Sequence, residues 1–66
     1  MQIVFNGQER ETADDITVAA LLEELKLPPK RVAVEVNLEL VARDQHAACV
    51  LQEGDQLEVV TLVGGG

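Results

Sequence analysis

Three consecutive glycines, Gly64, Gly65 and Gly66, have the clearest chemical potential in this sequence. The other two glycines, Gly7 and Gly54, lie where turns explain them. Because glycine has no Cβ, a glycine run can enter a narrow channel in an extended form. Three residues reach at most about 10 Å beyond the strand that precedes them. The pattern predicts a substrate tail: Gly64 and Gly65 thread a channel of another protein, and Gly66 presents its carboxylate to that protein's active site.

A frayed chain end is the alternative interpretation of the same glycines, because fraying is the common fate of a terminus. It does not explain why a strand rich in β-branched residues runs directly into three glycines. In either case we expect a flexible tail over residues 64–66, since nothing there can bury apolar surface.

His46 and Cys49 are spaced three residues apart, which on a helix would bring an imidazole and a thiol together. A Cys–His nucleophile is therefore geometrically possible. Any helix produces such pairs, however, and Cys49 lies in an apolar run, where a small buried thiol is the usual outcome. A domain of this size also encloses little space for catalysis. We interpret the pair as structural.

Two pairs of neighbouring carboxylates, Asp14-Asp15 and Glu23-Glu24, are the other candidates for chemistry. Catalytic carboxylates need a shared, partly dry cleft that separates their pKa values. Both pairs instead fall on the expected solvated surface or cap of a helix. One Cys and one His are too few ligands for a self-contained zinc site. We expect no catalytic residue and no metal site.

Composition excludes further classes of function. The 66 residues include twelve acidic and five basic side chains, for a net charge of −7, and Phe5 is the one aromatic residue. This balance repels a phosphate backbone and offers no stacking platform, so nucleic-acid binding is not expected. An acidic domain is steered toward a basic partner face. We also expect no membrane span and no signal peptide, and therefore a cytoplasmic, reducing location.

Hydrophobic periodicity predicts the elements that must position the tail. Asn6-Gly7 is a strong signal for a type I′ hairpin turn between two strands, the second of them an exposed edge. Thr17 is expected to cap a helix, which Pro28-Pro29 should end because proline cannot continue the backbone ladder. The predicted segments are strands at 1–5, 8–12, 32–37 and 57–63, a short strand or bend at 38–42, a helical turn or two at 44–50 and a turn at 53–55.

The helix predicted after Thr17 has a single apolar stripe, formed by Val18, Leu21, Leu22 and Leu25. One helix cannot cover both faces of a sheet. We therefore predict an α+β fold: a mixed sheet of four to five strands with one main helix on one face. A helical crossover after the hairpin permits one parallel pair of strands. Residues 1–63 form the domain, followed by the tail.

Alternation also predicts which side chains point away from the helix. If Leu57 and Val59 face the helix, then Val4, Val60 and Leu62 lie on the opposite face, close to the tail. An apolar patch there would be a natural docking surface for a partner. The alternative is that these are scattered surface residues without a role, which are common.

The whole chain resembles the ThiS family, the β-grasp (ubiquitin-like) sulfur carriers of thiamine biosynthesis. No single piece is decisive, because all ubiquitin-like carriers share the Gly-Gly end, but the combination is specific. The family pattern asks only for Gly65-Gly66, so Gly64 is a departure that should loosen the tail slightly. The matching pieces are the start Met1–Asn6, the stretch from Val36-Asn37 to Gln45, the block Gln52–Gln56 and the final Gly65-Gly66.

The resemblance implies chemistry at Gly66 that partner enzymes carry out. A ThiF-type adenylating enzyme would use ATP and magnesium to convert the Gly66 carboxylate into an acyl-adenylate. Sulfur taken from cysteine by a desulfurase would then displace AMP to give a thiocarboxylate, which thiazole synthase would consume. The carrier binds no cofactor itself. Asn37 and Arg43 also match the family pattern, and we interpret them as a turn residue and a member of a surface ion pair.

Three other functions fit the same sequence features. The chain could be the small subunit of molybdopterin synthase or another β-grasp sulfur carrier, with the same chemistry and a different acceptor. It could be a protein modifier joined through Gly66 to lysines. It could also be a passive β-grasp interaction module whose tail is merely frayed.

Overall fold

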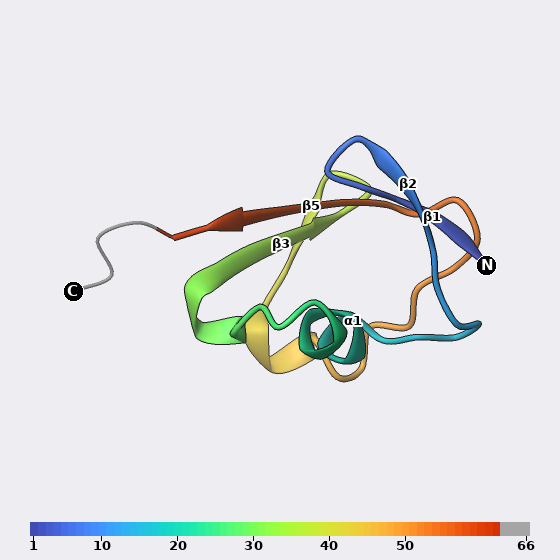
Figure 1. Ribbon diagram of the computed structural model, residues 1–66. Coiled ribbons are helices and arrows are strands. Elements are labelled where there is room, and N and C mark those ends of the chain that lie inside the picture. Colours follow the sequence, from blue (N-terminus) through green and yellow to red (C-terminus); the bar gives the residue numbers. More distant parts are fainter. Residues whose placement is uncertain (63–66) are drawn as a thin grey trace.

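A mixed five-stranded sheet with one α-helix packed on one face accounts for residues 1–62, the part of the chain that the computed structural model describes (Figure 1). This confirms the predicted α+β, β-grasp architecture. No helix within residues 1–62 has the length and apolar character needed to cross a lipid bilayer. The elements are β1 (Gln2–Phe5), β2 (Gln8–Glu11), α1 (Val18–Glu24), the 3₁₀ turn η1 (Pro29–Arg31), β3 (Val32–Val36), β4 (Glu39–Val41), the 3₁₀ turn η2 (Arg43–Gln45) and β5 (Gln56–Thr61).

The strand that precedes the glycines, β5, is the central strand of the sheet. The strand order is β2-β1-β5-β3-β4, so β5 is hydrogen-bonded on both sides. It runs parallel to β1, with Phe5 opposite Leu57, and antiparallel to β3, with Val34 opposite Val59. The predicted parallel pair is therefore confirmed. A central strand is the most firmly held position in a sheet, and here it directs the chain into the tail.

The hairpin between β1 and β2 has the predicted turn. Asn6 and Gly7 both adopt positive φ, 49° and 83°, as a type I′ turn requires. The returning strand β2 is a short, charged edge strand paired only with β1 among the described strands. The sequence therefore predicted both the turn and the position of β2.

The side chain of Asn6 has a second role that the turn signal did not reveal. Its Nδ2 donates to the carbonyl oxygen of Val59 at 3.1 Å, and the backbone nitrogen of Val59 donates to its Oδ1 at 2.8 Å. The amide thus takes the place of a backbone peptide group at the point where β1 ends. It extends the pairing of β5 beyond the end of its parallel neighbour.

Helix α1 begins as predicted and ends differently. The hydroxyl of Thr17 accepts a hydrogen bond from the backbone nitrogen of Ala20 at 3.1 Å, which confirms the cap. The helix ends at Glu24, however, before the prolines are reached. Lys26 adopts positive φ (60°), and the backbone nitrogen of Leu27 donates to the carbonyl of Leu22 at 2.8 Å. This is a Schellman motif, so the prediction that Pro28-Pro29 ends the helix was wrong.

Replacing Lys26 by glycine should stabilise the fold by about 0.5–1 kcal/mol, because only glycine adopts the left-handed conformation without a steric cost. Urea unfolding followed by far-UV circular dichroism measures the change. Lys30→Gly is the matched control, since Lys30 lies in η1 and is not among the residues with positive φ; it should destabilise or leave the fold unchanged. Equal effects of the two variants would contradict the role assigned to Lys26.

The hydrophobic core lies between the sheet and α1. The predicted stripe is buried at Val18, Leu21 and Leu22, while Leu25 is half-buried. Side chains alternate between the two faces along each strand, and the side chains on the inner face of the sheet pack against this stripe of α1. The buried apolar residues are Ile3, Ile16, Val18, Leu21, Leu22, Val32, Val34, Leu51, Leu57 and Val59.

The segment after β4 is less helical than predicted. A helical turn or two was expected over residues 44–50, but only the 3₁₀ turn η2 forms, and it ends at Gln45. The chain then crosses beneath the start of α1, where the backbone nitrogen of Val18 donates to the carbonyl of Cys49 and Thr17 forms an isolated bridge with Val50. These long-range bonds satisfy the first free N–H groups of α1 and pull residues 46–50 out of a helix.

Candidate functional site

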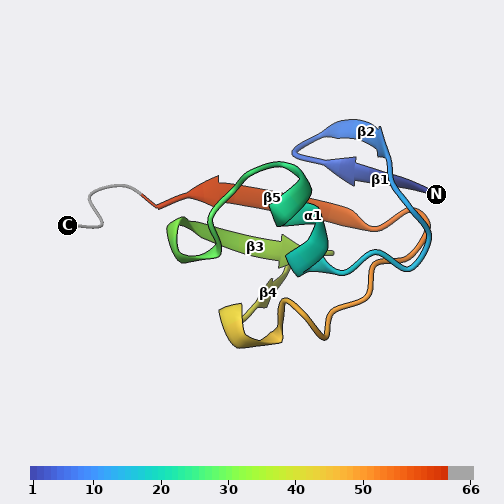
Figure 2. The same ribbon diagram turned by 60° about the horizontal axis from the view of Figure 1, so that its bottom comes forward.

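The last described residue, Leu62, shows where the chain leaves the fold. Its backbone nitrogen donates to the carbonyl of Arg31 at 2.7 Å, just after Val32 pairs with Thr61. The exit is therefore beside η1, at the end of the molecule opposite the N-terminus (Figures 1 and 2). The predicted tail residues Gly64, Gly65 and Gly66 lie outside the described residues.

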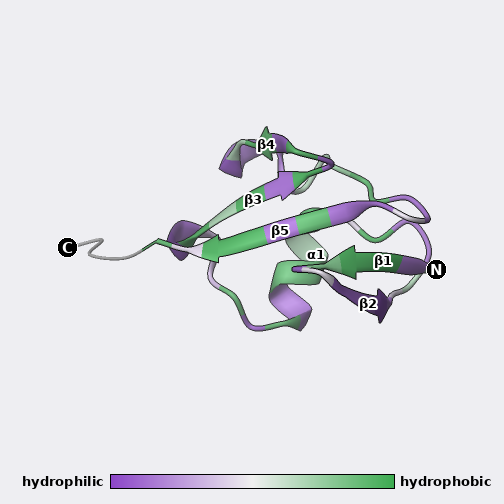
Figure 3. Cartoon of the chain, turned by 90° about the horizontal axis from the view of Figure 1, so that it is seen from above, coloured by the Kyte–Doolittle hydropathy of each residue, from purple (hydrophilic) through white to green (hydrophobic). Residues whose placement is uncertain are grey.

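The sheet face turned away from α1, here called the outer face, carries the three predicted docking residues. Val60 and Leu62 are exposed, at 55% and 51%, and Ala33 lies directly across from Val60. Val4 is half-buried and pairs with Gln56, four residues before Val60, or about 13 Å along the strand. Val60 and Leu62 are thus neighbours of the chain exit, whereas Val4 lies apart from them on the same face. Figure 3 shows this side of the sheet, with β5 running toward the chain exit and β1 beside the first part of β5. We call Val60 and Leu62 the outer patch.

Two carboxylates lie next to the outer patch. Glu35 on β3 is directly opposite Glu58 on β5, and both are exposed. Like charges in directly opposed positions destabilise a sheet. Within residues 1–62 neither forms an ion pair. The arrangement leaves negative charge beside exposed apolar side chains, which suits a partner surface with basic residues around an apolar centre.

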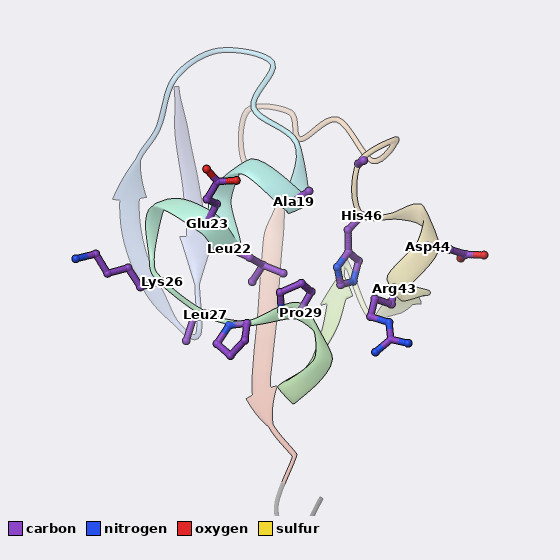
Figure 4. Close-up of a pocket in the computed structure, with 11 residues that line it drawn as sticks. Ala19, Leu22, Glu23, Lys26, Leu27, Pro29, Arg43, Asp44 and His46 are labelled. Atoms are coloured by element: carbon purple, nitrogen blue, oxygen red, sulfur yellow. The ribbon is translucent and has the colours of Figure 1, made fainter.

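A groove lies on the other side of the sheet, between the end of α1 and η2 (Figure 4). Its volume is about 680 Å³, and its lining is mostly apolar. The lining residues are Ala19, Leu22, Glu23, Lys26, Leu27, Pro28, Pro29, Arg43, Asp44, His46 and Ala47. Sequence analysis did not predict this groove, because it depends on the Schellman turn at Lys26 and on the 3₁₀ form of η2.

His46 forms part of the groove and is 4% exposed. Its Nε2 lies 3.3 Å from the carbonyl oxygen of Val41, which assigns the proton to Nε2 if the ring is neutral. The Nδ1 atom is buried and has no hydrogen-bond partner within the described part of the chain. A buried polar atom without a partner costs free energy, so it marks a place where local packing is not optimised for stability alone.

His46 and Cys49 are not brought together into a nucleophilic pair. The helix that would have aligned them does not form, and Cys49 lines a separate hollow together with Val36, Leu40 and Ala48. Cys49 is half-buried rather than fully buried. Burial, followed by the negative charge of Asp55, raises the pKa of its thiol above the usual range. Both effects disfavour the thiolate, which is the reactive form.

Cys49 should therefore react slowly with iodoacetamide at neutral pH. We expect the folded chain to react at least about threefold more slowly than the chain unfolded in urea at the same pH. The difference should shrink as the pH rises through the raised pKa, because the thiolate then forms in both states. Mass spectrometry of timed samples gives both rates. A folded-state rate equal to or above the unfolded rate would contradict this assignment.

The carboxylate pairs do not form a catalytic cleft. Glu24 lies 3.7 Å from Arg10, Asp14 lies 3.2 Å from the N-terminal nitrogen, and Glu23 borders the groove. No group of three or more potential metal ligands occurs within residues 1–62. These positions agree with the interpretation of solvated surface charges.

The structure agrees with the prediction made for Asn37 and disagrees with the one made for Arg43, the two residues that match the family pattern. Asn37 is in a turn, as predicted, with φ of 52°. Its amide also donates to Asp55 Oδ1 and accepts from the backbone nitrogen of Gln56, both at 3.0 Å, so it joins the β3–β4 turn to the start of β5. Arg43 was interpreted as a member of a surface ion pair. Among residues 1–62 it has no acidic partner, so that interpretation was wrong.

Comparisons with known proteins cover all or nearly all of the chain. The model of the ThiS family matches residues 3–66. The sulfur carrier protein ThiS of Escherichia coli is 38% identical over 66 residues, and the match covers 100% of both chains. A crystal structure of the thiamine biosynthesis protein ThiS from Geobacter metallireducens superimposes with a TM-score of 0.87 at 32% identity, again over 100% of both chains.

Two longer relatives also match. A protein named thiazole synthase from Paramagnetospirillum magneticum is 46% identical over 66 residues, and one from Magnetococcus marinus is 44% identical. The chain spans about a fifth of the length of these two relatives, 20% of each. On the family match, the full-length relative and the shared fold, this chain belongs to the ThiS family.

Proposed function

We propose that this chain is a sulfur carrier of thiamine biosynthesis whose reacting group is the carboxylate of Gly66. One observation carries the proposal: the chain matches a protein named as a sulfur carrier over the full length of both. The position of the glycines agrees with it, because in the sequence Gly64 is only three positions after Thr61, the last residue of the central strand. In this role the chain is a protein substrate and supplies no catalytic side chain.

The proposed chemistry begins at the Gly66 carboxyl group and has three steps. A ThiF-type adenylating enzyme uses magnesium and ATP, and the Gly66 carboxylate oxygen attacks the α-phosphorus to form an acyl-adenylate and release pyrophosphate. A desulfurase takes sulfur from cysteine as a persulfide, whose terminal sulfur attacks the acyl carbon and displaces AMP to give an acyl disulfide. A thiol, such as that of the cysteine present, then cleaves the S–S bond; the thiol ends in a disulfide with the donor sulfur, and the released product is a thiocarboxylate. Glycine at positions 64–66 favours the first two steps, because no Cβ obstructs the approach of the nucleophile or the walls of a channel.

The proposed acceptor is thiazole synthase. Two relatives that carry this name contain a segment matching all 66 residues, which supports a working association between the two parts. The outer patch beside the chain exit, with Glu35 and Glu58 next to it, is the surface proposed to dock on the partners. Val4 is proposed as an outlying member of that surface.

The intact mass of the 66-residue chain tests the proposal. The chain is incubated with ATP, magnesium, the cognate adenylating enzyme, a cysteine desulfurase and cysteine. The expected result is a mass gain equal to the exchange of one oxygen for one sulfur, which disappears when Gly66 is deleted. No gain, with an adenylating enzyme that is active on another carrier, would overturn the proposal. Transfer of the sulfur to molybdopterin synthase instead of thiazole synthase would keep the chemistry and replace the acceptor.

A further inference from the structure

The ladder of hydrogen bonds between β3 and β5 reaches η1, which lies beside the end of β5 (Figure 2). One step beyond the pair formed by Val32 and Thr61, the backbone nitrogen of Leu62 donates to the carbonyl of Arg31 at 2.7 Å. A hydrogen-bonded pair of antiparallel residues usually exchanges two such bonds. Here the second donor is used elsewhere, because the backbone nitrogen of Arg31 donates to the carbonyl of Pro28 at 3.0 Å. Leu62 is therefore held to this side of the sheet by one bond instead of two.

The register also shows what limits the ladder beyond this point. Hydrogen-bonded positions recur at every second residue, and the backbone nitrogen of Asn37 donates to the carbonyl of Gln56 at 2.7 Å in the same series as the Arg31 position. The next position of that series is Pro29, which in the same register would be opposite Gly64. Proline has no backbone N–H, so Pro29 cannot donate to a continuing β5. Of the two donors that a longer ladder would use, one is turned into η1 and the other does not exist.

The two prolines act on the backbone and not in the core. Pro28 and Pro29 are both exposed, and no residue of η1 is buried. Pro28 is extended, with φ of −68° and ψ of 128°, and Pro29 begins the 3₁₀ turn. Because proline fixes φ, this segment has few alternative conformations. The carbonyl of Arg31 is thus presented to Leu62 by a rigid turn.

We infer that η1 is a stop for the sheet: the bond from Leu62 to Arg31 sets the point from which the tail extends, and Pro29 keeps the ladder from taking up the glycines. The inference rests on the proposed function, in which the Gly66 carboxylate must reach an active site in another protein. Leu62 and Pro29 are positioning residues. They do not touch the reacting atoms and act by setting how many residues follow the last bond to the sheet.

That number of residues limits how far from the fold the carboxylate can react. The four residues 63–66 extend at most about 13–14 Å, and each of them adds about 3.3–3.6 Å. A displacement of about 1 Å from the productive position can cost roughly 100-fold in rate. One further ladder pair, between Pro29 and Gly64, would leave two residues and a reach of at most about 7 Å. The place where the ladder stops therefore matters as much as the glycines themselves.

A shortened tail tests the position of the stop. Deleting Gly64 keeps the terminal Gly-Gly but removes about 3.3–3.6 Å of reach, so kcat for adenylation should fall by about tenfold or more, with KM for the carrier within about twofold. Adding Leu62→Pro to the shortened chain removes the N–H that bonds to Arg31 and releases residues 61 and 62 from the ladder. The regained reach should raise kcat by at least about fivefold. Leu62→Ala in the same shortened chain loses the same side chain but keeps the N–H, and should recover nothing.

Exchange of pyrophosphate into ATP, with magnesium and the cognate adenylating enzyme, measures kcat and KM, and far-UV circular dichroism verifies the fold of each variant. Equal kcat values for Leu62→Pro and Leu62→Ala in the shortened chain would overturn the inference. A kcat unchanged by the deletion of Gly64 would overturn it too. Both results leave the proposed function intact, whereas failure of the original chain to be adenylated would overturn the proposed function as well.

The two prolines provide a matched test that needs no enzyme. Pro29→Ala supplies an N–H at the position that faces β5, whereas Pro28→Ala supplies one at the alternate position, which faces away from it. Pro29→Ala should therefore extend the ladder and slow hydrogen exchange of the Leu62 amide by about threefold or more. Pro28→Ala should not slow it. Nuclear magnetic resonance of the ¹⁵N-labelled chain measures the exchange, and equal rates in the two variants would overturn the role of η1 as a stop.

Discussion

Replacing Val60 by aspartate should weaken the complex with the adenylating enzyme by roughly 100-fold, which corresponds to about 2.7 kcal/mol. Val60 is 55% exposed on the outer face, next to the place where the chain leaves the fold. A carboxylate there would be desolvated in the complex, within the same surface as Glu58 and Glu35. An unpaired buried charge is among the most costly changes at an interface. The Kd for the enzyme without ATP measures the loss.

Val50→Asp is the matched control for this prediction. Val50 has the same side chain and nearly the same exposure, 48%, but lies in the segment that crosses beneath the start of α1. Both variants add one carboxylate to a chain of net charge −7, so the general electrostatic effect cancels between them. Similar affinities of the two variants would remove the outer patch from the docking surface. At saturating carrier the adenylation rate of the enzyme should be retained, because Val60 lies six residues before Gly66, the proposed site of reaction.

The sequence was sufficient to predict the arrangement that holds the tail. Asn6-Gly7 predicted the hairpin because few residues tolerate positive φ at both positions of a type I′ turn. The alternation in residues 57–63 separated buried Leu57 and Val59 from exposed Val60, since a strand has only two faces. These features depend on a few neighbouring residues, and local sequence determines them.

The end of α1, the groove and the conformation of residues 44–50 were not predicted from the sequence, because they depend on contacts between distant segments. Lys26 ends α1 although lysine is no signal for a left-handed conformation, and the prolines that follow suggested a later end. The groove then forms only because that turn approaches η2, about twenty residues further along the chain. The failure of residues 44–50 to form a helix has the same origin, because their carbonyls bond to the start of α1 instead. No local pattern contains that information.

Replacing Asn6 by alanine should destabilise the fold by about 2 kcal/mol or more. The backbone N–H and C=O of Val59 would lose the partners that the Asn6 amide supplies at 2.8 and 3.1 Å, and unsatisfied groups in partly buried positions cost about 1–3 kcal/mol each. Alanine at a φ of 49° adds steric strain. A domain of this size has roughly 3–10 kcal/mol of stability in total, so much of it would be lost.

Two further variants separate the causes of this loss. Asn6→Gly removes the amide without the steric strain, so its effect reports the hydrogen bonds to Val59 together with the added freedom of the unfolded chain, about 0.4–1 kcal/mol. Asn37→Ala also removes an amide at positive φ, 52°, but its bonds to Asp55 and Gln56 are exposed, and we expect a loss of about 1 kcal/mol. The chain has no Trp or Tyr, so urea unfolding is followed by far-UV circular dichroism. If Asn6→Ala destabilises no more than Asn37→Ala, the Asn6 amide does not hold β5. A large effect of Asn6→Gly would instead mean that a residue in the first turn of the chain holds β5, the central strand of the sheet.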